Sequence, residues 1–134
     1  MTIETKQISM DEAIARYYGV LEDADGSSEI TGPCGDQMGF SFKLENEQIT
    51  AIRFKATGCG VTLACGATVA FTVDGMLLSK AMMLSPGYIT KLIGNVPPDH
   101  RHCPILAATA FYRAIADYFL KTELKAKDNI NEQR

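Results

Sequence analysis

Alternation of apolar and polar residues marks a β-hairpin in the first half of the chain. From Met38 to Leu44 every second residue is apolar, which predicts a half-buried strand. The run Ile49–Ala56 predicts the antiparallel partner, and the turn falls midway between Asn46 and Glu47. The acidic segment before the hairpin, Leu21–Ser28, is rich in turn-forming residues and predicts a loop.

Helical signals fill most of the remaining sequence. Ser9 and Glu12 have the spacing of a capping box at the start of a short helix, Met10–Tyr18. A second helix is predicted over the small apolar residues Val61–Val73, followed by a short turn of helix over Ser79–Leu84. Ser85–Gly94 predicts another helix, with proline near its first position and glycine at its end.

The C-terminal segment predicts one long helix, from about Cys103 to Leu124. We expect residues 1–9 and 125–134 to be flexible flanks of one domain, 1–134. The predicted fold class is α+β: a small antiparallel sheet of about three strands packed against several helices. The apolar stripe of the long helix is expected to contain Ile105, Ala108, Phe111, Ile115 and Phe119.

Composition narrows the classes of partner. The chain is 46% hydrophobic and 22% charged, with a formal net charge of -3, so it lacks the basic surface that nucleic-acid binding requires. We see no secretory signal and no apolar run long enough to span a membrane, and we expect a cytoplasmic protein. In a reducing compartment, four cysteines indicate metal binding or catalysis rather than disulfides.

Three cysteines stand beside residues that suit a metal site. Cys34 lies in Gly-Pro-Cys-Gly-Asp and is two residues before Asp36, Cys59 lies between two glycines, and Cys103 follows His102. Thiolates, an imidazole and a carboxylate together form a ligand set for zinc or iron. For Cys65, within the apolar helix, we expect only core packing.

The sequence predicts that these cysteines lie close together and that two of them favour the thiolate form. Cys34 and Cys59 are equidistant from the centre of the hairpin turn, so a symmetric hairpin places them side by side at its open end. Cys59 and Cys103 each fall at the start of a predicted helix, where the free N–H groups favour a thiolate. Ligand and persulfide chemistry both need such anions.

These residues carry a resemblance to the iron–sulfur cluster scaffold family, which comprises the U-type scaffolds and the N-terminal domain of the nitrogen-fixation scaffold. The similarity runs from about Gly32 to Tyr118, with the motifs in family order. The matching segments are Cys34-Gly35-Asp36-Gln37-Met38, Phe54-Lys55-Ala56-Thr57-Gly58-Cys59-Gly60, Val96-Pro97-Pro98, His102-Cys103-Pro104-Ile105-Leu106-Ala107 and Ala114-Ile115-Ala116-Asp117-Tyr118.

The resemblance implies a non-enzymatic scaffold that builds a transient [2Fe-2S] cluster and donates it to acceptor apo-proteins. It implies Cys34, Cys59 and Cys103 as ligands of the cluster, or of Zn²⁺ in its place, with either Asp36 or His102 as the fourth. A cysteine desulfurase would supply the sulfur as persulfide. We expect neither a nucleic-acid nor a membrane partner, and a monomer or weak homo-oligomer.

Some features depart from the family pattern. The motif read by a dedicated Hsp70-type chaperone survives only as Val96-Pro97-Pro98, and His100 stands where that motif has lysine. This weakens the case for chaperone-driven transfer. Two alternatives stay open: a zinc-bound acceptor of persulfide sulfur, and a thiol enzyme with Cys103 as nucleophile and a histidine as base.

Overall fold

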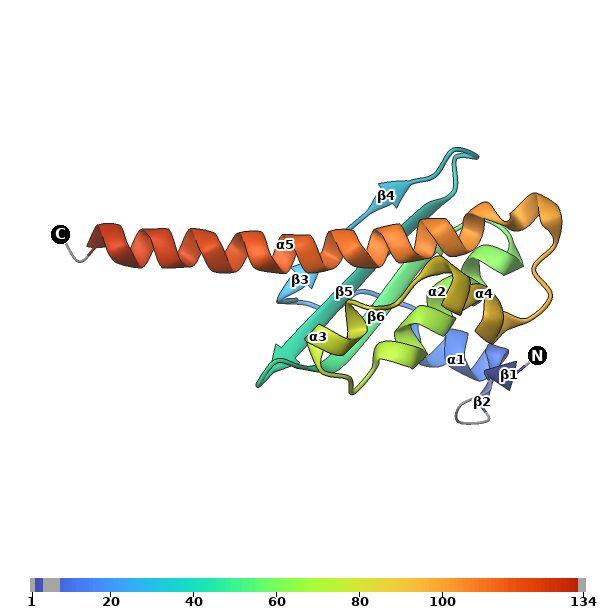
Figure 1. The fold of residues 1–134 in the computed structure, drawn as a ribbon, viewed down its shortest axis with the longest axis horizontal. Helices are drawn as coiled ribbons and strands as arrows, with labels where there is room; N and C mark the ends of the chain where they lie inside the picture. Colours follow the sequence, from blue (N-terminus) through green and yellow to red (C-terminus); the bar gives the residue numbers. More distant parts are fainter. Residues whose placement is uncertain (1, 4–7, 133–134) are drawn as a thin grey trace.

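The computed structural model describes the backbone of residues 2–3 and 8–132 and the side chains of residues 8–128. Its elements confirm the α+β class, with a small antiparallel sheet and a long C-terminal helix (Figure 1). In chain order they are β1 (Thr2–Ile3), β2 (Ile8–Ser9), α1 (Met10–Tyr17), β3 (Gly26–Ser27), β4 (Ile30–Thr31), β5 (Gln37–Glu45), β6 (Gln48–Thr57), α2 (Gly60–Val73), α3 (Leu78–Ala81), α4 (Pro86–Ile93), the 3₁₀ turn η1 (Pro98–His100) and α5 (His102–Glu132).

The main sheet has four strands arranged in three rows. The predicted hairpin is the pair β5–β6, and its turn residues Asn46 and Glu47 both have positive φ, 53° and 63°. Such a turn matches the twist of the two strands. Strands β3 and β4 pair with the other edge of β5 in one shared register and form an interrupted third row. Part of the acidic segment predicted as a loop is therefore strand β3.

The hairpin is not symmetric, because β6 contains a bulge. Glu45 pairs with Gln48 next to the turn, but beyond the irregularity between Lys43 and Leu44 the register moves by one residue, so that Gln37 pairs with Thr57. A bulge places an extra residue in one strand and shifts every later pair. The predicted direct opposition of Cys34 and Cys59 is therefore wrong by one residue.

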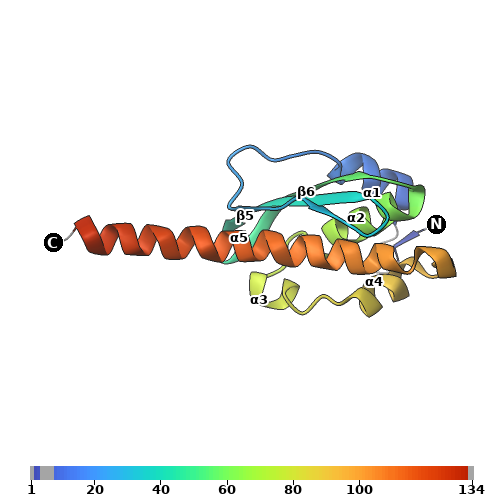
Figure 2. The ribbon, with the colours of Figure 1, turned by 90° about the horizontal axis from the view of Figure 1, so that it is seen from above.

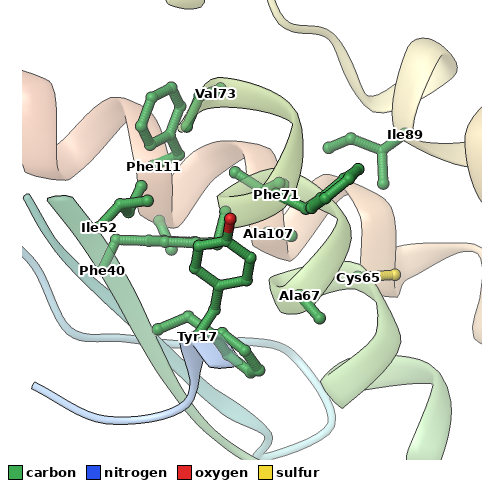
Figure 3. Close-up of a cluster of buried hydrophobic side chains, with 14 of the residues drawn as sticks. Tyr17, Phe40, Ile52, Cys65, Ala67, Phe71, Val73, Ile89, Ala107 and Phe111 are labelled. Carbon is green, nitrogen blue, oxygen red and sulfur yellow. The ribbon is translucent and has the colours of Figure 1, made fainter. Parts of the chain in front are cut away.

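Helices α1 and α2 pack with β6, and α5 crosses the sheet beside α2 and extends beyond the body of the molecule (Figures 1 and 2). The core between these layers is aromatic: Phe40 lies 5.8 Å from Phe111 and 6.5 Å from Phe54, measured between ring centroids. Figure 3 shows Phe40 and Phe111 in one buried cluster with Ala67 of α2 and Ala107 of α5. Helix α2 buries ten of its residues, which explains why it is apolar all round.

Helix α5 differs from its prediction in two ways. It continues to Glu132 rather than ending near Leu124, and the first residues of this extension, Lys125, Ala126 and Lys127, are good helix formers even without packing. Its buried face also differs in part from the expected stripe: Ala108, Phe111 and Ile115 are buried as predicted, but Ile105 is 56% and Phe119 47% exposed. Alanines take their place, because small side chains let α5 approach the sheet and α2 closely. The buried residues of this face include Leu106, Ala107, Ala110, Phe111 and Ala114.

The predicted capping of α1 is confirmed, since the backbone N–H of Glu12 donates to the Ser9 hydroxyl. Among the helices of the described residues, none combines the length and hydrophobicity needed to cross a bilayer. Residues 1–9 and 125–134 were expected to be flexible. Most of residues 1–9, and residues 133–134, lie outside the described part of the chain.

Candidate metal centre

Three segments meet at the open end of the hairpin. The loop between β4 and β5 contains Cys34 and Asp36, the junction of β6 with α2 contains Cys59, and η1 with the first turn of α5 contains a third group. That group consists of His100, His102 and Cys103. The strand order thus brings residues that are far apart in sequence to one edge of the sheet.

Gly58 lets the Asp36 loop approach Cys59. The φ of Gly58 is 140°, a conformation that residues with a side chain rarely adopt, and a Cβ there would lie 2.9 Å from the Asp36 carboxyl carbon. The bulge contributes as well, because the shifted register, continued past Gln37 and Thr57, brings Asp36 rather than Gly35 alongside Gly58. The carboxylate is therefore held against the start of α2.

The side chains form two overlapping groups that share Cys103. In the first, Cys59, His100 and Cys103 have their ligand atoms within 4.8 Å of one another, and His100 Nδ1 lies 3.4 Å from Cys59 Sγ. In the second, Asp36, His102 and Cys103 are equally close. There His102 Nε2 lies 3.7 Å from Cys103 Sγ and 4.0 Å from Asp36 Oδ2. The imidazole rings of the two histidines are stacked.

Thr62 lies beneath both groups and connects them. Its side chain is fully buried, and its hydroxyl donates to Asp36 Oδ2 at 3.1 Å. The same oxygen lies 3.5 Å from Cys103 Sγ and 3.7 Å from Cys59 Sγ. One hydroxyl therefore positions the carboxylate and contacts both thiols.

The environments of the thiols differ. Burial raises the pKa of Cys59, but hydrogen bonds from the Thr62 N–H, the Thr62 hydroxyl and the Val61 N–H outweigh it, so the net pKa is lowered. This confirms the prediction for Cys59. For Cys103 the prediction is wrong, because burial dominates and raises its pKa. Burial also raises the pKa of Cys65 to about 12, as expected for a core residue.

Cys34 is exposed and belongs to neither group, although it lies in the loop that contributes Asp36. The bulge accounts for part of this, since it moves Cys34 out of register with Cys59. The adjacent Gly35 has a φ of 85°, so the chain turns sharply after the cysteine. The role of Cys34 as a ligand stays a prediction.

Sequence reasoning missed two residues of the site. The sequence predicts no site role for His100 or Thr62. Thr62 carried a usable signal, because a hydroxyl three residues after Cys59 lies on the same side of the first helical turn. His100 reaches Cys59 through the path of η1, a tertiary feature that no local pattern predicts.

The donor set determines what the site can hold. Thiolates and imidazoles select zinc and iron over magnesium and calcium, and one carboxylate adds a hard ligand that exchanges readily. Cys103 is fully buried while Cys59 and Cys34 are exposed, so the site opens to solvent on one side. Fold and site together define a small α+β domain with an accessible, thiol-rich centre whose side chains have the chemistry and spacing to hold a metal ion.

Comparison with known proteins specifies this class further. The family model described as the NifU-like N terminal domain matches residues 7–125. The chain belongs to this family, which confirms the expected resemblance.

The relatives of known name are cluster-assembly scaffolds. The chain is 35% identical over 125 residues to the "Iron-sulfur cluster assembly scaffold protein IscU" of Aquifex aeolicus, covering 90% of this chain and 80% of that protein. It is 38% identical over 115 residues to the IscU scaffold of Escherichia coli K12, covering 82% of this chain and 89% of the other.

Solved structures share the fold. The putative SUF-system scaffold of Fervidobacterium islandicum AW-1 aligns with a TM-score of 0.62 at 20% identity, over 77% of this chain and 93% of that one. The NifU-like N-terminal protein of Brucella abortus also gives 0.62, at 16% identity, over 84% and 99%. At these identities the likeness concerns the fold alone.

Proposed function

We propose that the chain is a scaffold on which an iron–sulfur cluster is assembled and from which it is donated to acceptor proteins. The main observation in its support is that Cys59, Cys103, Asp36 and two histidines converge at one solvent-facing edge of the sheet. The scaffold names of the relatives support the same conclusion. Because the donor set suits binding and release, we propose a carrier that is not an enzyme.

In this proposal the cluster is cargo of the [2Fe-2S] type, with Cys34, Cys59 and Cys103 as its thiolate ligands. Either Asp36 or His102 completes the set. Exposed Cys34 would join when its loop closes over the bound iron, which its place beside Asp36 allows.

Sulfur would arrive as the terminal atom of a cysteine desulfurase persulfide and pass to an accessible thiolate of the scaffold. Becoming sulfide, each such sulfur takes up two electrons, which ferrous iron and an external thiol or ferredoxin-type reductant would supply. An acceptor thiolate would then replace the weakest ligand. The carboxylate fits that place, because hard oxygen is a poor partner for iron already bound by soft sulfur.

The test is anaerobic reconstitution with ferrous iron, cysteine, a reductant and a desulfurase, followed by absorbance and by iron and sulfide analysis. The expected result is a labile chromophore with equal iron and sulfide, lost in Cys59→Ala and Cys34→Ala. Cys65→Ala is the matched control, since that thiol lies in the core and should leave the yield unchanged. Tight zinc with transferable persulfide and no chromophore would instead support the sulfur-acceptor alternative.

The role of Asp36 gives a separate prediction. Asp36→Ala removes the exchangeable oxygen ligand, so the assembled cluster should persist longer and transfer more slowly to an acceptor apo-protein. Decay of the chromophore in the presence of apo-ferredoxin measures this. Decay as fast as in the unchanged protein would contradict the role.

A further inference from the structure

His100 lies between a thiol and a carboxylate. Its backbone is fixed in η1, where its N–H donates to the Pro97 carbonyl. Its Nδ1 lies 3.4 Å from Cys59 Sγ, while its Nε2 faces Asp99 Oδ2 at 3.9 Å. With the proton on Nε2, toward the carboxylate, the Nδ1 lone pair lies on the side of Cys59. In this tautomer the nitrogen beside Cys59 is the one that can bind a metal ion.

The spacing of the three atoms in the first group matches a tetrahedral site. Bonds of about 2.3 Å from zinc to sulfur and about 2.0 Å to nitrogen place neighbouring ligand atoms about 3.6 Å apart. The sulfur–nitrogen distance of 3.4 Å between Cys59 and His100 is close to this value, and Cys103 Sγ lies within 4.8 Å of both. Small side-chain rotations would bring all three to bonding distance.

We propose that Cys59, His100 and Cys103 form a zinc-binding set in which His100 Nδ1 is the nitrogen ligand. The inference deepens the proposed function, because it uses two of the same thiols. Two thiolates balance the charge of Zn²⁺ and a neutral imidazole adds none, so the partly buried site binds the ion without residual charge. Three protein ligands leave a fourth position for an incoming ligand.

His102 belongs to the other group and is not equivalent to His100. It lies near Asp36 and Cys103, and it is absent from the group that contains Cys59. The two histidines are separated by one residue and are about equally exposed, 31% for the His100 side chain and 27% for His102. Because His102 is itself a candidate ligand, the control is Arg101, an exposed residue between the two histidines that belongs to neither group.

A competing role for His100 is that of a base acting on Cys59, with Asp99 as the orienting group. The geometry favours this role less. The 3.9 Å separation between His100 and Asp99 is too long for a hydrogen bond, and the Asp99 side chain is 83% exposed. A base also has no use for the second thiol, whereas Cys103 converges on the same point as the other two.

The experiment measures the zinc affinity of the full chain by competition with a chromophoric chelator. Spectra of the Co²⁺-substituted protein report on thiolate and nitrogen ligation. His100→Ala is expected to raise the dissociation constant for zinc by about tenfold or more, since even the loss of an outer-shell partner costs that much. Arg101→Ala, an exposed residue that belongs to neither group, is expected to leave it unchanged. In long-range ¹H–¹⁵N NMR of the unchanged protein, zinc should shift Nδ1 of His100.

Unchanged zinc affinity in His100→Ala, or an equal loss in Arg101→Ala, would overturn the proposal. Unchanged affinity together with slower alkylation of Cys59 would identify His100 as the base instead. Both variants alter exposed or partly exposed side chains, and matching thermal melts without metal would show that folding is not the cause. This test is separable from the test of the scaffold function. Zinc binding through His100 in a protein that assembles no cluster would refute only the scaffold function. Cluster assembly with no effect of His100→Ala on zinc affinity would refute only the role of His100 as a zinc ligand.

Discussion

Thr62→Val tests whether the buried hydroxyl beneath the site holds Asp36 in place. Valine has nearly the shape of threonine, so the change removes the hydroxyl from a fully buried position without opening a cavity. Asp36 Oδ2 then loses its 3.1 Å hydrogen bond, and both thiols lose a polar neighbour. The backbone N–H of Thr62, which also stabilises the Cys59 thiolate, stays in place.

The expected loss of stability follows from this one bond. A hydrogen bond to a charged group contributes about 1.5–3 kcal/mol, and the low end applies because the Asp36 side chain is 21% exposed and water replaces part of the bond. Burying a methyl in place of the hydroxyl returns about 0.8 kcal/mol. The net loss is about 1 kcal/mol. For 134 residues this corresponds to a fall in Tm of about 4 °C.

The assay is thermal unfolding of the metal-free protein in a double-mutant cycle with Asp36→Ala. In the Asp36→Ala background, Thr62→Val should no longer destabilise the protein and should gain up to about 0.8 kcal/mol, because the bond is already absent while the methyl is still buried. An equal loss in both backgrounds would refute the reasoning, since the hydroxyl would then act through some other contact. Removing the hydroxyl should also raise the pKa of Cys59 and slow its alkylation at neutral pH.

Two further predictions concern groups outside the metal centre. Cys65, with a pKa of about 12, should resist iodoacetamide in the native protein at pH 8 and react only after denaturation, while Cys59 reacts in the native state; peptide-resolved mass spectrometry separates them. Burial raises the pKa of Asp117, but the Ser27 N–H and the Lys121 ammonium outweigh it, so the net pKa is lowered. The stability that this lowered pKa provides is present above the unfolded-state pKa of about 3.9 and is lost as the pH falls below it. Asp117→Asn should therefore lower the free energy of unfolding by up to about 1 kcal/mol at pH 6 and not at all near pH 2. Urea unfolding at the two pH values measures this difference.

The hairpin shows what a local pattern can and cannot predict. Both strands and the turn follow from alternation, because one face of the sheet is buried and the other is not. The bulge was missed although its signal is in the sequence: Ile49 and Ile52 are both fully buried, and a spacing of three breaks the period of two. That one residue decides whether Gly35 or Asp36 lies beside Gly58.

Helix α5 shows a different limit. Periodicity places one apolar stripe on it, but large residues were given more weight than alanines, and the buried face proved to be rich in Ala107, Ala110 and Ala114. Which face of a helix is buried depends on how closely its neighbours approach, and α2 contains many small residues. The exposure of Ile105 and Phe119 follows from this packing between helices, which the sequence of one helix alone cannot predict.

The two thiols at helix starts explain why the electrostatics of the site could be only half predicted. Cys59 and Cys103 both stand where free N–H groups favour an anion, and the sequence argument is identical for both. Cys59 faces solvent, so its hydrogen bonds prevail and lower its pKa, whereas Cys103 is fully buried and desolvation raises its pKa. Local sequence predicts where a helix begins or ends. The solvent exposure of that end depends on every element packed around it, which local sequence does not predict. The buried thiol therefore needs a bound metal to become a thiolate, because coordination displaces its proton.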